Sequence, residues 1–377
     1  MTVLCNYPPT NRECRRRGAS GQLPGVDPGP GRGYLLAMPD PEGTARIVVN
    51  DGERIIPARP GRPLLFSLMT ERIFIPSACG GRASCGQCRV HITSGAPAHA
   101  AEERAVLSAE EMGQGVHLAC QTRDFSELHI QLPQGYLLAR QFSCSVSAIR
   151  DPAPGMREVD LDLVEPAGMP FMAGQYVQFL LPGTEGNEQP VYRAYSVASP
   201  PSCPRRLTLL MTLVEGGACT PYVFTRLREG DHVHVNGPLG GFSVREGSRE
   251  LLFIAGGSGI APVRSMLLDL AGRGVDRRAT FFYSARTSAD LIYRTEIEAL
   301  GRAMEGFRFI PVLSHPLPQE AWPGEIGGLP AALARLLPRL DHHEAYLCGG
   351  PGLIDACIGA LRSRGLGEEL IFFDKFF

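Results

Sequence analysis

The sequence has no excess of charge of one sign and no long apolar run. Lys and Arg total 37 against 39 for Asp and Glu, which gives a formal net charge of −2. This balance provides no electrostatic reason to expect a nucleic-acid partner. No segment approaches the ~18 consecutive apolar residues of a membrane helix, and no apolar signal core follows the arginines at 15–17. We therefore expect a cytoplasmic protein without a transmembrane segment.

Cysteine is scarce as well, and several catalytic motifs are missing. The 11 cysteines in 377 residues are too few for the disulfide framework of a small secreted domain, and their odd number favours reduced thiols or metal ligands. The sequence contains no Gly-x-x-x-x-Gly-Lys loop, no Gly-x-Ser-x-Gly elbow and no His-Glu-x-x-His pair. Kinase and hydrolase functions are therefore not expected.

Glycine and proline, by contrast, are abundant, at 44 and 32 residues. Most of residues 1–43 combine them with arginine and few large apolar side chains, so this segment cannot bury enough surface to offset the entropy of ordering. We predict a disordered arm there. A small α+β domain follows at 44–133, in which Ile47–Val49, Arg54–Ile56 and Leu64–Met69 indicate two strands and a short helix.

The rest of the chain shows two further patterns. Residues 134–245 hold short β-rich runs separated by Gly and Pro turns, as in a small antiparallel barrel. From 246 to 377, apolar strands alternate with helices, beginning with Leu251–Ala255 and Ala261–Leu270. That alternation predicts a doubly wound parallel sheet. The expected fold class is therefore multidomain, with α+β, antiparallel β-barrel and α/β parts in that order.

Four cysteines have the spacing of a ligand set for a metal cluster. Cys79, Cys85 and Cys88 share one loop, and Cys120 follows after thirty-one intervening residues. An iron-sulfur cluster needs converging thiolates, and a loop rich in small residues lets the backbone wrap the inorganic core. Zinc is the alternative, although zinc sites usually show two paired short Cys spacings. We predict that these four cysteines bind an iron-sulfur cluster.

The cysteine loop resembles that of plant-type 2Fe-2S ferredoxins, with one residue more between the first two cysteines. The longer spacing, with Gly-Gln before Cys88, is similar to that in the ferredoxin-bearing subunit of the sodium-translocating NADH:quinone oxidoreductase. Reductase components of the phenol hydroxylase type more often carry the shorter spacing. The resemblance implies a β-grasp ferredoxin domain at 44–133 that holds a 2Fe-2S cluster.

A second motif, Arg193-Ala-Tyr195-Ser196, follows a predicted strand of the barrel. A guanidinium can clamp a pyrophosphate, a tyrosine can lie against an isoalloxazine face, and a serine hydroxyl can reach the flavin N5 atom. The turn with Gly217 and Thr220 then offers amides and a hydroxyl to phosphates before a predicted helix. Together these segments resemble the flavin-binding domain of the ferredoxin-NADP reductase superfamily, which implies FAD as the flavin.

A third motif follows the first strand of the α/β domain. There the apolar strand runs into a glycine turn and a helix N-terminus, where bare amides can approach a dinucleotide pyrophosphate. The predicted binding residues of this turn are Gly256, Gly257, Ser258, Gly259 and Pro262.

Two later segments complete the predicted dinucleotide site. Cys348 and Gly349 end a strand and resemble the start of the Cys-Gly-Pro-Pro segment of the same superfamily, whose cysteine stands beside the nicotinamide ring. Ser284 and Arg286 match the position where that superfamily holds the adenosine ribose, with Tyr293 as a further candidate. Because Arg286 is the one obvious positive charge for a 2′-phosphate, we expect NADH rather than NADPH.

The C-terminal Asp374-Lys-Phe376 resembles the terminal Asp-x-Phe of the same quinone oxidoreductase family. In that family the aromatic side chain covers the flavin face that nicotinamide must reach. Phe376 is therefore a candidate gate and, with Ser196 and Cys348, one of three candidate catalytic residues. The alternative is a phenylalanine that packs on the edge of the sheet.

Three sites in series imply one electron path from NADH through FAD and a 2Fe-2S cluster to a partner. A hydride carries two electrons and the cluster takes one, so a flavin is the necessary middle carrier. We predict a reductase that serves a respiratory, quinone-reductase-like acceptor, in the cytoplasm or at the inner face of the membrane. A soluble reductase component of a multicomponent oxygenase is the alternative, and a non-enzymatic cluster-bearing interaction protein is a third. The quinone oxidoreductase family carries a membrane helix before its ferredoxin domain, where this chain has the arm at 1–43.

Overall fold

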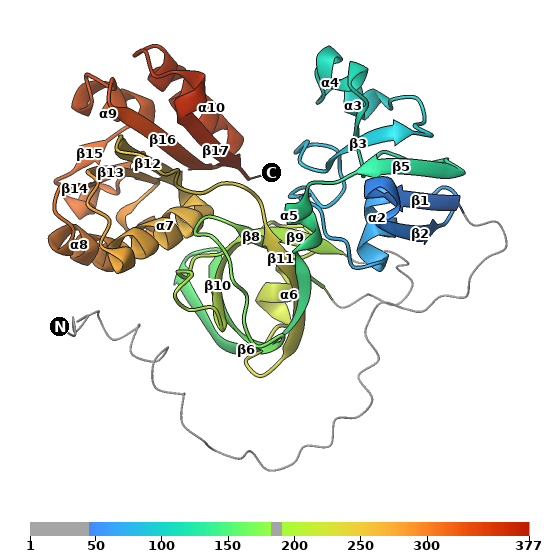
Figure 1. Ribbon diagram of the computed structural model, residues 1–377. Helices are drawn as coiled ribbons and strands as arrows, with labels where there is room; N and C mark the ends of the chain where they lie inside the picture. Colours follow the sequence, from blue (N-terminus) through green and yellow to red (C-terminus); the bar gives the residue numbers. More distant parts are fainter. Residues whose placement is uncertain (1–44, 182–190, 377) are drawn as a thin grey trace. The chain divides into compact units, whose positions relative to one another are not determined.

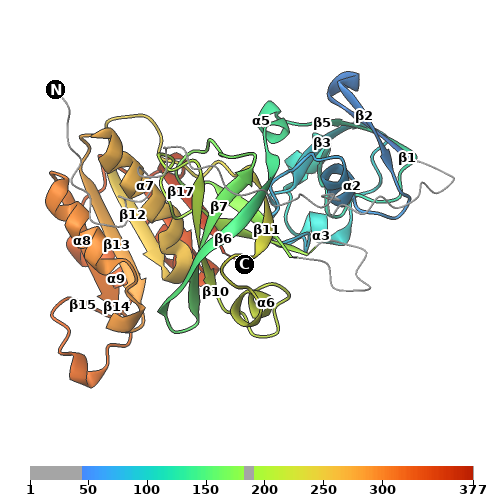
Figure 2. The same cartoon turned by 90° about the horizontal axis from the view of Figure 1, so that it is seen from below.

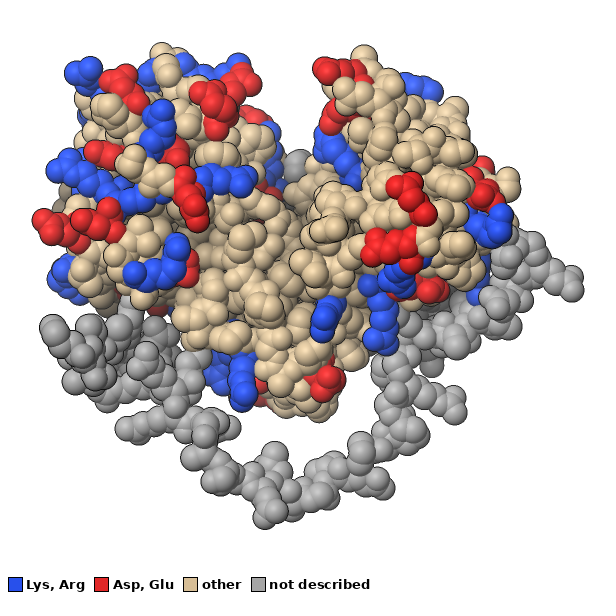
Figure 3. All heavy atoms as spheres, viewed as in Figure 1, with Lys and Arg blue, Asp and Glu red and all other residues tan. Residues whose placement is uncertain are grey.

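The computed structural model describes residues 45–181 and 191–376. The predicted arm at 1–43 lies outside the described residues. Three sheets organise the described chain (Figure 1). Within these ranges, no helix combines the length and the apolar character needed to cross a membrane. On the face shown in Figure 3, Lys and Arg are interspersed with Asp and Glu, as the balanced net charge leads one to expect.

The first domain consists of a mixed β-sheet and short helices. Its elements are β1 (Ala45–Val49), β2 (Arg54–Ala58), α2 (Leu64–Thr70), β3 (Arg89–Ser94), α3 (Ala101–Arg104), α4 (Ala109–Gly113), β4 (Val116–Leu118) and β5 (Glu127–Gln131). The strand order is β2-β1-β5-β3-β4, and β1 pairs antiparallel with β2 but parallel with β5. Every second residue of β1 is buried, and α2 buries six of its seven residues. This packing confirms the predicted α+β fold of the first domain.

The second sheet is an antiparallel barrel. The short helix α5 (Gln134–Leu137) leads into it. Its strands are β6 (Arg140–Ala153), β7 (Met156–Glu165), β8 (Tyr176–Leu180), β9 (Tyr192–Ser196), β10 (Arg206–Thr212) and β11 (His232–Leu239), and the helix α6 (Thr220–Thr225) lies between β10 and β11 in the chain. The order is β10-β7-β6-β11-β8-β9, and a bridge from Val197 to Leu209 joins the two edges and closes the barrel. The Arg193–Ser196 motif comes after β8, as expected, and itself forms part of β9.

The third sheet is parallel throughout, as predicted. Its strands are β12 (Glu250–Gly256), β13 (Ala279–Ala285), β14 (Phe307–Leu313), β15 (Glu325–Ile326), β16 (His343–Gly349) and β17 (Ile371–Lys375), in the order β15-β14-β13-β12-β16-β17. Four helices flank it: α7 (Ile260–Arg273), α8 (Arg294–Ala303), α9 (Leu329–Leu336) and α10 (Pro351–Arg362). Figures 1 and 2 show α7 and α8 on one face, and Figure 1 shows α9 and α10 on the other. This arrangement buries the strands on both faces and confirms the doubly wound fold.

The strand order of the third sheet reverses between β12 and β16. From β12 the chain proceeds to β13, β14 and β15 on one side, and then returns to place β16 and β17 on the other. In open α/β sheets, ligands bind outside the carboxyl ends of the strands at such a switch point. The glycine turn at 257–259 follows β12, and Gly349 ends β16. Both predicted dinucleotide-binding segments therefore lie at the switch point.

Candidate functional site

The four predicted cluster cysteines lie together as two pairs. Cys79 and Cys85 have their sulfur atoms 3.4 Å apart, and the thiol of Cys88 is hydrogen-bonded to that of Cys120. The hydrogen bond from Cys85 lowers the pKa of Cys79 to about 4, and the one from Cys88 lowers the pKa of Cys120. Three of the four side chains are fully buried, while that of Cys85 is partly exposed. The four thiols therefore lie as two neighbouring pairs in one largely buried site.

The two thiol pairs match the ligand needs of a two-iron cluster. A 2Fe-2S cluster needs two thiolates at each of its two irons. The loop wraps tightly around the thiols, because Gly80, Gly81 and Gly86 all have positive φ and the amide of Gln87 points at the Cys85 sulfur from 3.5 Å. The residues present therefore fit the predicted cluster.

A cavity of about 290 Å³ lies beside this loop. Arg193, Tyr195 and Ser196 of β9 line it, as do Gly217 and Thr220 of the turn before α6. The cavity thus collects the five flavin-binding residues that the sequence predicts. Further lining residues that sequence reasoning missed are Ala78, Arg82, Tyr176 and Asp374, which only the packing of the domains brings to one place.

The side chains of the flavin motif have specific partners. Arg193 donates to the backbone oxygen of Tyr192 at 2.7 Å, which holds its guanidinium at the cavity wall. The hydroxyl of Tyr195 donates to the sulfur of Cys219 at 3.5 Å, and burial raises the pKa of this tyrosine. The Thr220 hydroxyl accepts from the amide of Val214 at 2.9 Å and so ties the two ends of its own loop together. Thr220 therefore shapes a turn that lines the cavity.

The dinucleotide turn packs directly on the end of β16. Ala255 and Cys348 are partners in the register of β12 and β16. A Cβ atom at Gly259 would lie 2.2 Å from the Cys348 carbonyl oxygen, and one at Gly256 would lie 2.3 Å from a methyl of Leu353. At Gly259 the two backbones meet more closely than any side chain allows, whereas at Gly256 the Leu353 side chain fills the space of a Cβ atom. Pro262 is buried in the first turn of α7.

Cys348 lies deeper than its predicted role suggests. Its side chain is 0% exposed, and burial raises its pKa well above the ordinary thiol value, so it is a neutral thiol. It is not among the described residues that line the cavity. Ser258 and Phe376 do line it, and the amide of Phe376 donates to the Gly349 oxygen at 2.9 Å. Phe376 thereby fixes the chain end against the β16 loop.

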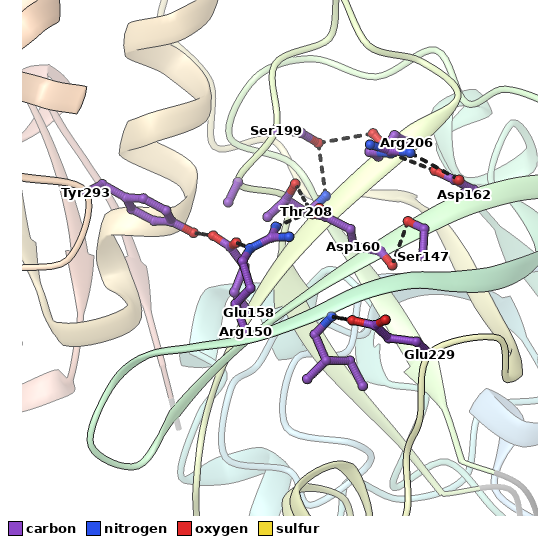
Figure 4. Close-up of polar contacts among 12 residues, drawn as sticks. Ser147, Arg150, Glu158, Asp160, Asp162, Ser199, Arg206, Thr208, Glu229 and Tyr293 are labelled. Atoms are coloured by element: carbon purple, nitrogen blue, oxygen red, sulfur yellow. Dashed lines mark hydrogen bonds and ion pairs between the residues drawn. The ribbon is translucent and has the colours of Figure 1, made fainter. Parts of the chain in front are cut away.

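On the predicted ribose side, Ser284 lies near the end of β13 and Arg286 follows that strand with an exposed side chain. Tyr293, the further candidate, has its hydroxyl bonded to Glu158 of the barrel, and the Arg264 guanidinium lies 4.5 Å from the centre of its ring. Figure 4 shows this tyrosine reaching the carboxylate beside Arg150. Tyr293 therefore joins the α/β domain to the barrel rather than presenting a free hydroxyl to a ribose.

Asp374 is a half-buried carboxyl group in the wall of this cavity. It pairs with Cys348 in the register of β17 and β16. Burial raises its pKa from 3.8 to about 6. The sequence pointed to Phe376 of the same tripeptide but did not distinguish this carboxyl from an exposed one.

Comparison with known proteins assigns a cofactor to each of three parts of the chain. The chain matches the family models described as "2Fe-2S iron-sulfur cluster binding domain" at residues 47–123, "Oxidoreductase FAD-binding domain" at 143–244 and "Oxidoreductase NAD-binding domain" at 253–358. The cofactors implied by the sequence are therefore confirmed as 2Fe-2S, FAD and NAD.

Similar proteins extend over nearly the whole described chain. A subunit of the Na(+)-translocating NADH-quinone reductase of Idiomarina loihiensis is 30% identical, with 89% of this chain and 92% of the relative covered. The reductase component of phenol 2-monooxygenase from Pseudomonas sp. (strain CF600) is 34% identical, with 88% and 94% covered. The crystal structure of an Amycolatopsis cytochrome P450 reductase is 29% identical with a TM-score of 0.72, covering 88% of this chain and 99% of that one. The chain therefore belongs to the ferredoxin-NADP reductase-type flavoprotein oxidoreductases that carry a 2Fe-2S ferredoxin domain.

Proposed function

We propose that the chain is an NADH-dependent reductase that takes a hydride from NADH onto FAD and delivers single electrons through its 2Fe-2S cluster to a respiratory, quinone-reductase-like acceptor. The observation that carries the proposal is the composition of one cavity. Its walls come from the cysteine loop (Ala78), from the barrel (Arg193 and Tyr195) and from the α/β domain (Ser258 and Phe376). A flavin bound there would contact both the α/β domain that binds NADH and the loop that carries the cluster cysteines.

FAD, when bound, supplies the exchange between a two-electron hydride and one-electron steps. On the protein side, Arg193 would pair with the pyrophosphate, supported by the amides of the turn at Gly217. Tyr195 would flank the ring, and Ser196, which is 5% exposed, would direct its hydroxyl towards the hydride-accepting edge. In this assignment Cys79, Cys85, Cys88 and Cys120 hold the cluster.

The α/β domain would orient the nicotinamide cofactor. The amides of Gly257–Gly259 at the start of α7 suit a pyrophosphate, and Ser284 and Arg286 suit the adenosine ribose. Cys348 would position the nicotinamide from behind as a neutral thiol. Phe376 would cover the ring face and move aside when nicotinamide arrives.

The acceptor has two candidates. The 30% identity to a quinone reductase component supports the respiratory acceptor, at the cytoplasmic side of the membrane where NADH is available. The 34% identity to a phenol monooxygenase reductase component and the fold similarity to a P450 reductase favour, as the second candidate, a soluble oxygenase. Both acceptors would draw single electrons from the cluster, so the chemistry within the chain is the same.

Two measurements test the proposal. First, anaerobic addition of NADH to the purified chain should bleach its flavin absorption and then reduce the cluster. If the protein contained no flavin, or if NADH left the flavin oxidised, the result would instead favour a non-enzymatic, cluster-bearing interaction protein. Second, the full chain should copurify from its native cells with a membrane quinone reductase complex and reduce it. Copurification with, and electron delivery to, a soluble oxygenase would establish the alternative acceptor.

A further inference from the structure

A buried hydrogen-bond network joins the cysteine loop to the barrel. The hydroxyl of Tyr176 accepts from the amide of Ser77 at 3.1 Å and donates to the side-chain oxygen of Gln87 at 3.1 Å. The Ser77 hydroxyl lies 2.9 Å from the Tyr192 hydroxyl and accepts from the Gln178 side chain at 2.9 Å. Ser77 and Gln87 belong to the loop that carries the cluster cysteines, whereas the other three belong to β8 and β9.

The network continues into the barrel. The side chain of Asn236 on β11 donates to Gln178 at 3.4 Å and accepts from Gln141 on β6 at 3.3 Å. Gln178 also donates to the backbone oxygen of Ile75 at 3.2 Å. Three side chains in this network are completely buried, namely Ser77, Gln178 and Asn236, at 0% exposure. The loop is thus bound directly to β8 and β9, and through Gln178 to β11 and β6.

The polar network is not needed to hold the first domain and the barrel together. Tyr192, Tyr176 and Leu239 of the barrel already belong to the same apolar core as the first domain, and the rings of Phe66 and Tyr192 meet edge to face at 6.4 Å. Burying polar groups brings little net stability even when each is satisfied, and a polar network mainly selects one relative position over others. The network therefore fixes the position of the cysteine loop relative to the barrel, and adds little to the free energy that holds the two together.

This positioning acts at the point where the two cofactor sites meet. Tyr176 lines the flavin cavity, while its hydroxyl holds Gln87, which precedes Cys88. Ser77 lies two residues before Cys79. Gly80 follows Cys79, and a Cβ atom there would lie only 2.5 Å from the Arg193 guanidinium. The cysteine loop and the flavin motif are therefore in contact.

We propose that Ser77, Tyr176, Tyr192 and Gln178 are positioning residues for electron transfer, which hold the cluster loop against the wall of the flavin cavity. The inference rests on the proposed function. In the step that they serve, one electron leaves the reduced flavin and one is gained by the oxidised cluster, and no bond of the protein forms or breaks. The second electron of the hydride follows after the cluster has passed the first to the acceptor. Small displacements of positioned groups cost rate steeply, so loss of this positioning should slow this step selectively.

The test uses Ser77→Ala, because Ser77 lies in the network but does not line the cavity. In anaerobic rapid mixing of the loaded protein with NADH, flavin reduction should stay within about twofold of the parent. Cluster reduction should slow by at least about fivefold, the rate equivalent of one hydrogen bond. In the oxidised protein, without NADH, hydrogen exchange of the peptide spanning 75–88 should be faster, while that of β1 and β2 stays unchanged.

Ser67→Ala is the matched control. Ser67 is a buried serine of the same domain whose hydroxyl has no hydrogen-bond partner among the described residues, so its removal should change neither the rates nor the exchange. Tyr192→Phe keeps the ring and serves if Ser77→Ala does not fold. It should reproduce the slower cluster step, and the double variant should lose less than the sum of the two single effects.

Three outcomes would overturn the inference. They are an unchanged cluster step in both variants, an equal slowing in Ser67→Ala, and an unchanged exchange rate at 75–88. If NADH does not reduce the flavin of the parent protein, the proposed function fails instead, and the exchange experiment still reports on the network.

Discussion

The carbonyl oxygen of Cys348 occupies the space into which any side chain at Gly259 would extend. A Cβ there would lie 2.2 Å from that oxygen and 2.8 Å from the amide nitrogen of Gly349. Because both obstacles are backbone atoms at the end of a central strand, they cannot rotate away. The first turn of α7 and the end of β16 must move apart if this glycine is replaced.

We expect Gly259→Ala to impair NADH-dependent flavin reduction strongly and to cost about 1–3 kcal/mol of unfolding free energy, as overpacking does. The measurements are single-turnover flavin reduction and denaturant unfolding. Gly272→Ala is the control in the same helix, since nothing lies within 4 Å of a Cβ there. It should be neutral or stabilise by up to about 1 kcal/mol. Equal effects of the two variants would contradict the argument.

Phe376→Ala tests the gate. If the ring covers the flavin face, its removal should change the rate of hydride transfer or the preference for NADH over NADPH. Rapid mixing with each nucleotide measures both. Phe373→Ala removes a neighbouring phenylalanine that is 49% exposed, and it should leave both quantities unchanged. Kinetics of Phe376→Ala identical to the parent would mean that this ring only packs on the sheet edge.

Asp374 predicts a pH-dependent stability. Burial raises the pKa of this carboxyl to about 6, from 3.8. The folded state therefore binds a proton that the unfolded state has lost, and stability falls as pH rises from about 4 through 6. Asp374→Asn should raise the thermal unfolding temperature at pH 8 and have little effect at pH 4. Asp355→Asn, which removes the exposed partner of Lys375, is the control. A destabilised Asp374→Asn at pH 8 would contradict the expected sign.

Cys120→Ser should abolish the cluster without abolishing the flavin step. Cys120 completes one of the two thiol pairs, so its loss leaves one iron with a single thiolate. We expect loss of bound iron and of the paramagnetic signal of the reduced cluster, with retained FAD and NADH-dependent flavin bleaching. Cys357→Ser, at a fully buried cysteine of α10, should keep its iron. Retention of the cluster in Cys120→Ser would remove this residue from the ligand set.

Local patterns were sufficient for most of the fold. Apolar strands such as Leu251–Ala255 and the cysteine spacing are properties of short segments. The structure contains the predicted strand and brings Cys79 and Cys85 together. β6 carries a weaker sequence signal, because serines alternate with its buried Phe142, Cys144 and Val146.

The cavity walls, in contrast, depend on packing between domains. Nothing in the neighbourhood of Tyr176 or Asp374 in the sequence indicates which partner their side chains will face. The same limit affected Tyr293, whose position near Arg286 in sequence suggested a ribose contact, although its hydroxyl is bound to Glu158. Cys348 is aligned with Ala255 in the sheet, yet its side chain is fully buried and does not line the cavity.

The network around Ser77 has a consequence for protein engineering. Redox modules of this kind invite domain exchange, in which another ferredoxin is fused to an existing flavin unit. Here the two domains meet at more than the point where the chains are fused. Ser77 and Gln87 of the cysteine loop are hydrogen-bonded to barrel side chains, namely Tyr176, Tyr192 and Gln178. A chimera that transplants the cysteine loop alone would inherit its cluster but lack the matching contacts. Successful exchange requires both halves of this interface to be carried over together.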